Sequence, residues 1–286
     1  MTPDLVTVVV PTRNNERTIE ACLRSVAGQS HPEVELVVVD NHSTDLTQSI
    51  AHRYAGSVLV AGPERSAQRN LGLDQARGSW FLWLDSDMVL PPECLATALD
   101  TADRLAVDAV ALPERTVGDG FWTACRALER SCYLDDPWLH NPRLVRTGLM
   151  RELGGFDLSM SGPEDADLRH KIRATGREIA LAPVLVDHDE GRLTLREVMV
   201  KRYYYGRSIP SFMEANRGAA VSQGRTILEA YVRNRRRLGR DPVHAVGMVG
   251  MRAAEAVAYG VGARRGSRDA RDAGDAGDAG DGGSRS

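Results

Sequence analysis

The 286-residue sequence lacks a strong excess of charge of either sign, because 36 lysines and arginines stand against 39 acidic residues and leave a net charge of −3. That balance excludes the strongly basic composition of a protein whose main partner is nucleic acid. Cysteine is also scarce, and the four cysteines form no Cys-x-x-Cys pair and no metal-type spacing with histidine (Cys22, Cys94, Cys125 and Cys132). Neither a zinc site nor a disulfide framework is indicated, and we expect buried, reduced thiols.

The sequence also lacks a basic start followed by a long apolar run, which is the pattern of a secretory signal peptide. We therefore expect a cytoplasmic protein. A weakly apolar segment at residues 243–261 is interrupted by Arg252 and Glu255, and these charges argue against a membrane-spanning helix. An interfacial or core helix fits this segment better, and the arginines before it suggest peripheral contact with the inner face of a membrane.

The first half of the chain alternates short β-branched runs with longer stretches of helical period, as in a parallel sheet covered by helices. We expect strands at residues 6–10, 34–39, 57–60, 80–84 and 109–112. In an open parallel sheet the C-terminal strand ends line the ligand crevice. The polar residues that follow the strands should therefore surround one site, among them Thr12, Arg13, Asp40 and Asp85.

Composition divides the chain into three expected parts. Residues 1–195 form the α/β domain, and residues 196–261 form a basic, aromatic, helical extension. In that extension, the cations and tyrosines at residues 201–207 could close over a diphosphate, bind a phosphate-bearing acceptor, anchor at a membrane or simply cover the core. Residues 262–286 contain no Leu, Ile, Val or aromatic residue, so we expect a disordered tail that cannot offset the entropy of ordering.

Two carboxylates follow the apolar strand that ends near residue 84. Asp85 and Asp87 are separated by one residue, and in extended backbone alternate side chains point the same way. A hard cation such as Mg²⁺ or Mn²⁺ is held by one or two carboxylates and completes its shell with water and phosphate oxygens. The spacing alone fits a solvated turn equally well, because aspartates are common in turns.

Three segments, taken in order, resemble the family 2 glycosyltransferases of the GT-A fold: residues 8–14 (VVVPTRN), residues 37–45 (VVVDNHSTD), and residues 65–72 with the Asp-x-Asp run at 78–88. The resemblance covers roughly residues 6–189. It implies a Rossmann-like α/β fold with a mixed, mainly parallel sheet, helices on both faces and a helical C-terminal extension. It also implies a nucleotide-diphosphate sugar as donor and Mn²⁺ or Mg²⁺ as cofactor.

The resemblance also implies roles for individual residues. Pro11, Thr12, Arg13 and Asp40 would hold the nucleotide, with Asp40 accepting hydrogen bonds from the base. In the Asp-x-Asp motif, Asp85 and Ser86 would face the ribose or the metal shell. Asp87 would bind the metal directly.

No glycine-rich phosphate loop of the GxGxxG or GxxxxGK[ST] type is present. A metal must therefore neutralise the diphosphate. Arg65 or Arg69 would assist through charge-assisted hydrogen bonds, or would instead form a structural ion pair or a solvated helix face.

A second acidic cluster at residues 161–168 opens an expected helix. Acids in a first helical turn offset the helix dipole and cap free N–H groups, which is the structural alternative for this cluster. Preceded by Gly-Gly-Phe-Asp at residues 154–157, it resembles the Glu-Asp element of inverting members. That resemblance implies that Asp165 is the general base, and that Glu164 positions the acceptor or holds Asp165 in place.

His188 follows a short strand and lies between two aspartates in the sequence. A lone histidine is more often structural than a ligand, but many GT-A enzymes place a further metal ligand at this point. Neutral imidazole is an acceptable ligand for Mn²⁺, and its second nitrogen needs an orienting partner.

The sequence thus predicts a metal-dependent inverting glycosyltransferase acting on an acceptor hydroxyl or phosphate that is either soluble or lipid-linked. Two alternatives stay open. A nucleotidyltransferase would also combine an α/β sheet with a metal-bound phosphate, although the chain lacks the glycine-rich, lysine-containing opening loop. A non-catalytic nucleotide-sugar-binding or membrane scaffold protein would bind the donor without turnover.

Overall fold

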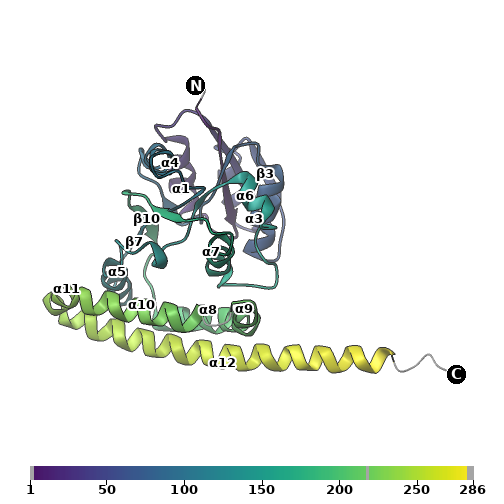
Figure 1. Cartoon of the computed structure of the whole chain (residues 1–286), viewed down its shortest axis with the longest axis vertical. Helices are drawn as coiled ribbons and strands as arrows, with labels where there is room; N and C mark the ends of the chain where they lie inside the picture. The colour runs from purple at the N-terminus through teal and green to yellow at the C-terminus, as the bar shows by residue number, and fades with distance from the viewer. Residues whose placement is uncertain (1–2, 217–218, 282–286) are drawn as a thin grey trace.

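The computed structural model describes residues 3–216 and 219–281 (Figure 1). Its centre is a seven-stranded sheet with the strand order β3-β2-β1-β4-β8-β6-β9. The strands are β1 (Val6–Thr12), β2 (Val34–Asp40), β3 (Ser57–Val60), β4 (Trp80–Trp83), β6 (Ala109–Ala111), β8 (Leu144–Arg146) and β9 (Ile179–Leu181). Only β8 runs against its neighbours in this sheet, and the other pairings are parallel. The expected mixed, mainly parallel sheet is confirmed.

A smaller sheet lies beyond the C-terminal end of β4. It pairs β5 (Met88–Val89), β10 (Val186–Asp189) and β7 (Glu114–Val117), with β10 in the middle. The register places His188 opposite Met88 and therefore next to the Asp-x-Asp turn. This small sheet brings a late segment of the chain to the edge of the central sheet where the site was expected.

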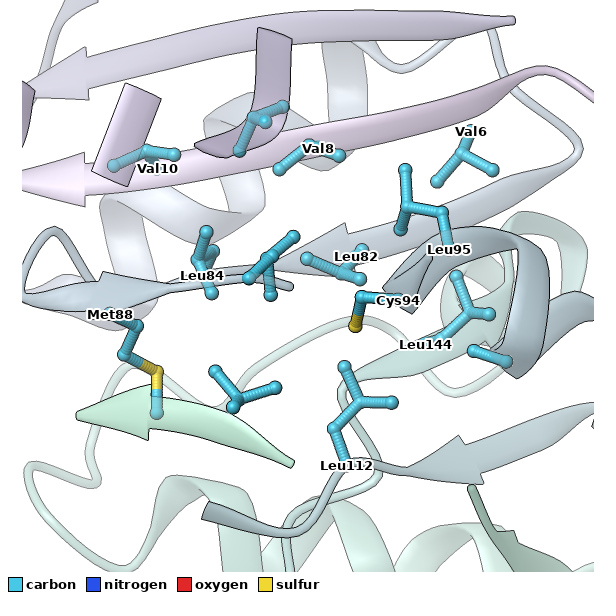
Figure 2. Packing of buried hydrophobic residues seen from close by; sticks show 14 of the residues in the cluster. Val6, Val8, Val10, Leu82, Leu84, Met88, Cys94, Leu95, Leu112 and Leu144 are labelled. Atoms are coloured by element: carbon cyan, nitrogen blue, oxygen red, sulfur yellow. The ribbon is translucent and has the colours of Figure 1, made fainter. Parts of the chain in front are cut away.

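Helices cover both faces of the central sheet. One face carries α1 (Ile19–Ala27), α2 (Thr47–Ala51) and α4 (Cys94–Leu105), and the other carries α3 (Arg65–Gln75), α6 (Thr147–Glu152) and α7 (Glu164–Ala174). The alternation of the strands explains this arrangement: Val8 and Leu82 point into the first core (Figure 2), whereas Val9 points into the second. The four cysteines are buried and unpaired.

A layer of helices lies below the sheet (Figure 1). It contains α5 (Phe121–Ser131), the 3₁₀ turn η1 (Pro137–Leu139), α8 (Leu195–Gly206), α9 (Ile209–Ala215), α10 (Ala219–Arg233), α11 (Arg235–Arg240) and α12 (Pro242–Asp281). The long helix α12 is the outermost element and packs along α8 and α5. Within the described residues, no helix is both long enough and apolar enough to cross a membrane.

The structure continues α12 (Pro242–Asp281) into the segment expected to form a disordered tail at residues 262–286, and the disorder of that tail stays a prediction. Residues 282–286 lie outside the described range. The expectation counted large apolar side chains, but here the helix is held by close backbone approach. A Cβ atom added to Gly206 would lie 2.6 Å from the Tyr259 carbonyl oxygen, and one on Gly262 would clash with the Tyr203 carbonyl. Glycine at these positions lets α8 and α12 meet without bulky side chains.

The charges that interrupt the apolar segment at residues 243–261 turn inward. Glu255 is buried and pairs with Arg126 of α5, with Arg202 of α8 at 2.8 Å and with Arg252 at 3.0 Å. Arg252 also pairs with Glu129 of α5, which is fully buried. A buried network of ion pairs therefore joins α12 to α5 and α8.

Candidate active site

A pocket of about 540 Å³ opens where β1 and β4 end. The structure brings many of the expected residues to its wall, namely Pro11, Thr12, Arg13, Arg65, Asp85, Ser86, Asp87 and Glu164. Four residues of α8 complete the opposite side: Val200, Lys201, Tyr204 and Tyr205. The pocket is therefore enclosed between the sheet and the helical layer, and the basic stretch at residues 201–207 contributes directly to it.

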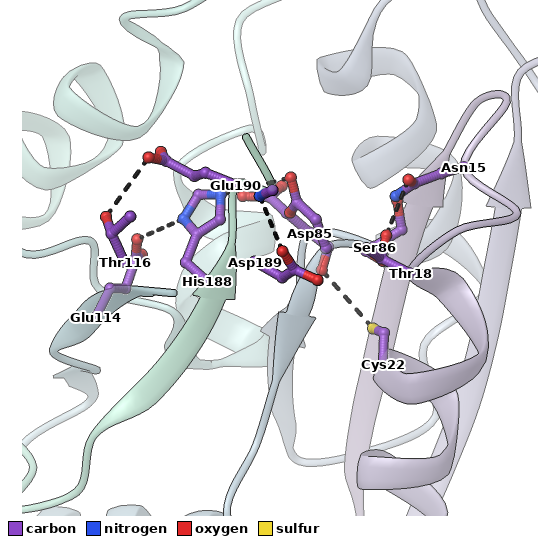
Figure 3. Close-up of polar contacts among 12 residues, drawn as sticks. Asn15, Thr18, Cys22, Asp85, Ser86, Glu114, Thr116, His188, Asp189 and Glu190 are labelled. Atoms are coloured by element: carbon purple, nitrogen blue, oxygen red, sulfur yellow. Dashed lines mark hydrogen bonds and ion pairs between the residues drawn. The ribbon is translucent and has the colours of Figure 1, made fainter. Parts of the chain in front are cut away.

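The Asp-x-Asp turn is fixed against the start of α1. The Ser86 hydroxyl accepts a hydrogen bond from the Asn15 amide at 2.7 Å (Figure 3). The Ser86 carbonyl accepts another from the Thr18 hydroxyl at 3.0 Å. These contacts orient the two aspartates on either side of Ser86.

Asp87 and His188 lie together at this turn. The distance from His188 Nε2 to Asp87 Oδ2 is 3.4 Å, and His188 Nδ1 lies 3.2 Å from Glu114 Oε2 on the neighbouring strand (Figure 3). The other carboxylate oxygen of Asp87, Oδ1, is buried and has no hydrogen-bond partner. A buried carboxylate oxygen without a partner needs a cation or a water, and so this pair fits a divalent metal.

The pKa values of Asp87 and His188 reflect the contact between the two side chains. Burial alone would lower the pKa of His188, but its contacts with Asp87 and Glu114 outweigh that effect and raise the pKa to about 9. Burial would likewise raise the pKa of Asp87, yet the contact with His188 lowers it. Asp87 and Glu114 therefore stabilise a proton on His188, and a metal held by Asp87 and His188 would replace that proton, because imidazole binds a metal in its neutral form.

The protein supplies only part of a coordination shell. Among the residues that the structure describes, no group of three or more His, Cys, Asp or Glu side chains is arranged to hold a metal. A cation bound by Asp87 and His188 would therefore need oxygens from a ligand or from water, as expected for a metal that binds with a diphosphate.

Asp85 faces two buried arginines instead of open solvent. Its Oδ1 lies 2.8 Å from Arg69 Nη2, and its Oδ2 lies 3.0 Å from Arg143 Nη2. Burial would raise the pKa of Asp85, but Arg143 and Arg69 hold it well below its usual range. Both carboxylate oxygens of Asp85 are therefore paired, and this side chain is suited to positioning Arg69 and Arg143 at the base of the pocket.

The two acids at the start of α7 have different surroundings. Glu164 lines the pocket and lies 3.0 Å from Arg65 Nη2. Asp165 does not line this pocket. Its Oδ1 accepts hydrogen bonds from Arg69 Nη1 at 2.9 Å and from the Trp83 indole at 3.2 Å.

The second oxygen of Asp165 is bound by a residue that lines a smaller cavity. Asp165 Oδ2 accepts a hydrogen bond from the Asn141 amide at 3.1 Å. Asn141 lines a separate cavity of about 150 Å³ together with Tyr133 and His140. The side chain of Asp165 keeps 16% of its surface exposed.

Asp40 does not reach the pocket. It is fully buried, and its carboxylate accepts hydrogen bonds from the Ser43 hydroxyl, from the Ser43 N–H at 2.8 Å and from the Gln48 amide at 2.6 Å. Its neighbour Asn41 lines the pocket instead. The structure therefore differs from the expectation that Asp40 binds the base directly, because both of its carboxylate oxygens already accept hydrogen bonds from Ser43 and Gln48.

Sequence reasoning missed two residues at the base of the site. Arg143 is buried and joins Asp85 to Glu114, which lies 2.8 Å from it. Neither residue belongs to a recognisable motif, and the only signal is that each stands beside a short apolar strand. Their importance becomes visible only when β7, β8 and the Asp-x-Asp turn meet.

A Rossmann-like sheet with a polar pocket and an Asp-x-Asp turn at its carboxyl edge is the architecture of an enzyme that handles nucleotide ligands. The model of the family described as glycosyl transferase family 2 matches residues 7–155, and the chain belongs to this family.

Comparison with solved structures shows the same fold. The mannosyltransferase PcManGT of Pyrobaculum calidifontis, in complex with GDP-Man and Mn²⁺, has a TM-score of 0.61 at 20% identity, over 94% of this chain and 90% of that one. Staphylococcus aureus TarS 1-349 with UDP-GlcNAc has a TM-score of 0.54 at 19% identity, over 91% and 90%. At this identity the likeness concerns the fold, and it confirms the GT-A arrangement.

Curated relatives match over a shorter segment. Glycosyltransferase AglE of Haloferax volcanii is 31% identical over 114 residues, which are 37% of this chain and 38% of that protein. The poly(ribitol-phosphate) β-N-acetylglucosaminyltransferase TarS of Staphylococcus aureus is 37% identical over 108 residues, which are 34% of this chain and 18% of TarS. The matched segment spans well under half of either relative.

Proposed function

We propose that this protein transfers a sugar from a nucleotide-diphosphate sugar to an acceptor hydroxyl or phosphate, with inversion at the anomeric carbon and with Mn²⁺ or Mg²⁺. The observation that carries the proposal is the unpartnered buried oxygen of Asp87, which lies beside His188 on the wall of a pocket at the carboxyl edge of the sheet. Mn²⁺ accompanies the donor in the PcManGT complex, which supports the same cofactor here.

Asp87 and His188 would hold the metal, which, when bound, neutralises charge on the donor diphosphate. The chain's own cations add to this. Arg65 is kept in place by Glu164 at 3.0 Å and by a hydrogen bond to the Tyr205 hydroxyl at 2.9 Å. Lys201 lines the same pocket. Pro11, Thr12 and Arg13 provide the wall for the nucleoside, with Asn41 in place of Asp40 as the neighbouring polar group.

Asp165 is the proposed general base. In an inverting transfer the acceptor oxygen bonds to the anomeric carbon while the bond from that carbon to the diphosphate oxygen breaks, and the bonding electrons leave with the nucleotide diphosphate. The acceptor's proton goes to a carboxylate on the opposite face. Arg69, Trp83 and Asn141 fix both oxygens of Asp165, so that the acceptor would approach from the Asn141 cavity while the donor occupies the larger pocket.

The acceptor class follows from charge and from one relative. TarS is named for a ribitol-phosphate polymer acceptor. In this chain, Arg130 lines the Asn141 cavity, from which the acceptor would approach, and this favours a phosphate-bearing acceptor, either soluble or linked to a lipid. Contact with the inner face of a membrane belongs to the same proposal, and the surface that would make it is considered below.

A donor panel tests this function. Wild type is incubated with UDP-, GDP- and dTDP-sugars and Mn²⁺, and release of nucleoside diphosphate and donor binding are both measured. One donor should be hydrolysed slowly. Asp87→Ala should lower release at least about a hundredfold and weaken metal-dependent binding, since it removes the charge stabilisation. Asp165→Asn should keep donor binding while transfer to an acceptor falls by about 10²–10⁴-fold.

The matched control is Asp74→Asn, which removes an exposed carboxylate on α3 that does not line the pocket. It should behave as wild type. If wild type binds a donor but releases no nucleoside diphosphate in any condition, and if Asp165→Asn behaves as wild type does, the protein is instead a nucleotide-sugar-binding scaffold. Absence of metal-dependent binding to every donor would contradict the assignment of Asp87 and His188.

A further inference from the structure

The outward face of α12 is apolar over most of its packed length. Five valines on this helix expose between 50% and 74% of their surface: Val243, Val246, Val249, Val257 and Val261. The exposed residues between them are small and uncharged, namely Gly250, Ala253, Ala256 and Gly260. The charged side chains of this stretch, Arg252 and Glu255, form the buried ion pairs described above. In the described stretch 243–261, the solvent-facing stripe therefore has no charged side chain.

Arginines stand at both ends of this stripe. Exposed arginines precede it on α11 and follow it on α12: Arg235, Arg236, Arg237, Arg240, Arg264, Arg265 and Arg268. Residues 219–269 contain ten arginines against four acids, although the whole chain is net negative. Of those four acids, Glu255 is buried, while Glu229 pairs with Arg225, Asp241 pairs with His244, and Asp269 pairs with Arg207 and Arg265. Helices α10, α11 and α12 therefore carry more exposed arginines than exposed acids.

This distribution of charge argues against a second copy as the occupant of the stripe. Pairing two α12 helices side by side in parallel would place each arginine cluster against its own counterpart. Antiparallel pairing would place the arginines near residue 264 against those near residue 236. Like charges would meet in either orientation, and the stripe itself carries no acid to offset them.

We propose that the outward face of α12 binds the surface of an anionic lipid bilayer. An amphipathic helix with an apolar stripe and flanking arginines lies in the plane of the interface, where the stripe enters the acyl boundary and the guanidinium groups meet lipid phosphates. The outermost position of α12 leaves this face free to do so (Figure 1).

The geometry also connects the bilayer to the site, a step that rests on the proposed function. Helix α8 packs along α12 on one side and contributes Lys201, Tyr204 and Tyr205 to the donor pocket. Packed helix axes are about 8–10 Å apart, so the pocket wall lies one helix layer above the bound surface. An acceptor whose phosphate is anchored in the bilayer would then be presented beside the donor.

Flotation of the full chain with vesicles tests the proposal without any donor. The probes are phosphatidylcholine vesicles with and without phosphatidylglycerol, in about a 3:7 mixture at about 0.1 M salt. Wild type should float with the anionic vesicles, remain unbound with the neutral ones and dissociate as salt rises. Val246→Asp with Val257→Asp should reduce partitioning at least about tenfold. Arg236→Glu with Arg264→Glu should reduce it further, because each arginine near an anionic surface contributes about fivefold.

Leu105→Asp is the control, since Leu105 is 49% exposed on α4, a helix of the sheet domain. It should bind vesicles as wild type does. Circular dichroism and melting of each variant establish that the fold is retained. Equal binding by wild type and the Val246/Val257 variant would overturn the proposal, and so would a failure of wild type to bind anionic vesicles. A dimer in light scattering that this variant abolishes, without vesicle binding, would overturn it in favour of a second copy.

These results are separable from those of the donor panel. Vesicle binding by a protein that releases no nucleotide would support the membrane surface and contradict only the transfer reaction. Nucleotide release by a protein that binds no vesicle would support the transfer reaction and contradict only the membrane surface.

Discussion

Different interactions stabilise the central sheet and the helical layer beneath it. The sheet buries valines, leucines and tryptophans in two cores, one on each face. Among its described residues, the layer has a small apolar cluster around Cys125, Val198, Met248 and Met251 and a contact of Phe212 with Met160. Buried ion pairs join its helices α5, α8 and α12. Apolar burial is non-directional, whereas a buried ion pair stabilises only when both partners are present. The packing of α12 on α5 and α8 should therefore respond more strongly to single charges and to pH than the two apolar cores of the sheet do.

The largest expected effect comes from breaking the ion network at its centre. Glu255→Ala leaves Arg126, Arg202 and Arg252 without their shared carboxylate, and we expect a loss of about 3–5 kcal/mol in the docking of α12. Limited proteolysis within α12 should accelerate while the sheet keeps its hydrogen-exchange protection. Simultaneous loss of protection in β1 and β4 would show that the two regions unfold as one unit.

A core substitution provides the opposite test. Leu82→Ala removes a fully buried side chain from the first core and should cost about 2–5 kcal/mol of unfolding free energy. Thermal unfolding monitored by circular dichroism should shift as a whole, without earlier cleavage of α12. Selective release of α12 in this variant would contradict the comparison, since Leu82 makes no part of the layer.

The next difference between the two regions is expected at low pH. Burial would raise the pKa of Glu255, but Arg202, Arg126 and Arg252 outweigh it and lower the pKa to about 2. Because the folded pKa lies below the usual 4.5, the stabilisation is complete above about pH 4.5 and is lost as pH falls toward 2. Protease sensitivity of α12 should rise across that interval, and Glu255→Gln should flatten the dependence. An unchanged profile in Glu255→Gln would assign the effect to other carboxylates.

The close contact between α8 and α12 gives the smallest effect. Gly262→Val would force a Cβ against the Tyr203 carbonyl, and overpacking of this kind costs about 1–3 kcal/mol. Asp269→Ala removes two partly exposed pairs, one with Arg207 and one with Arg265, and should cost about 0–1 kcal/mol. Urea unfolding of both variants checks the order. Equal stability of the two would mean that the helices part without cost at Gly262.

The site could be predicted only in part. The pocket wall at Pro11, Thr12 and Arg13 follows from the rule that parallel strands end at one edge, and the structure brings these residues there. The pairing of Asp87 with His188 depends on β10 entering the small sheet beside Met88, which short polar strands do not reveal. The same rule predicts Asp40 in the pocket, but in the structure its carboxylate accepts hydrogen bonds from Ser43 and Gln48 instead.

Local pattern was sufficient to establish the sheet, because period-two burial along each strand and period-3.6 burial along each helix leave few other ways to hide these side chains. It was also sufficient to place the acidic turn after β4. Only the tertiary structure decided where Arg252 and Glu255 point, how α12 continues past Gly262 and which arginines hold Asp85. Ion pairs and glycine contacts depend on which helices meet, and residues distant in the sequence become neighbours only when the chain is folded.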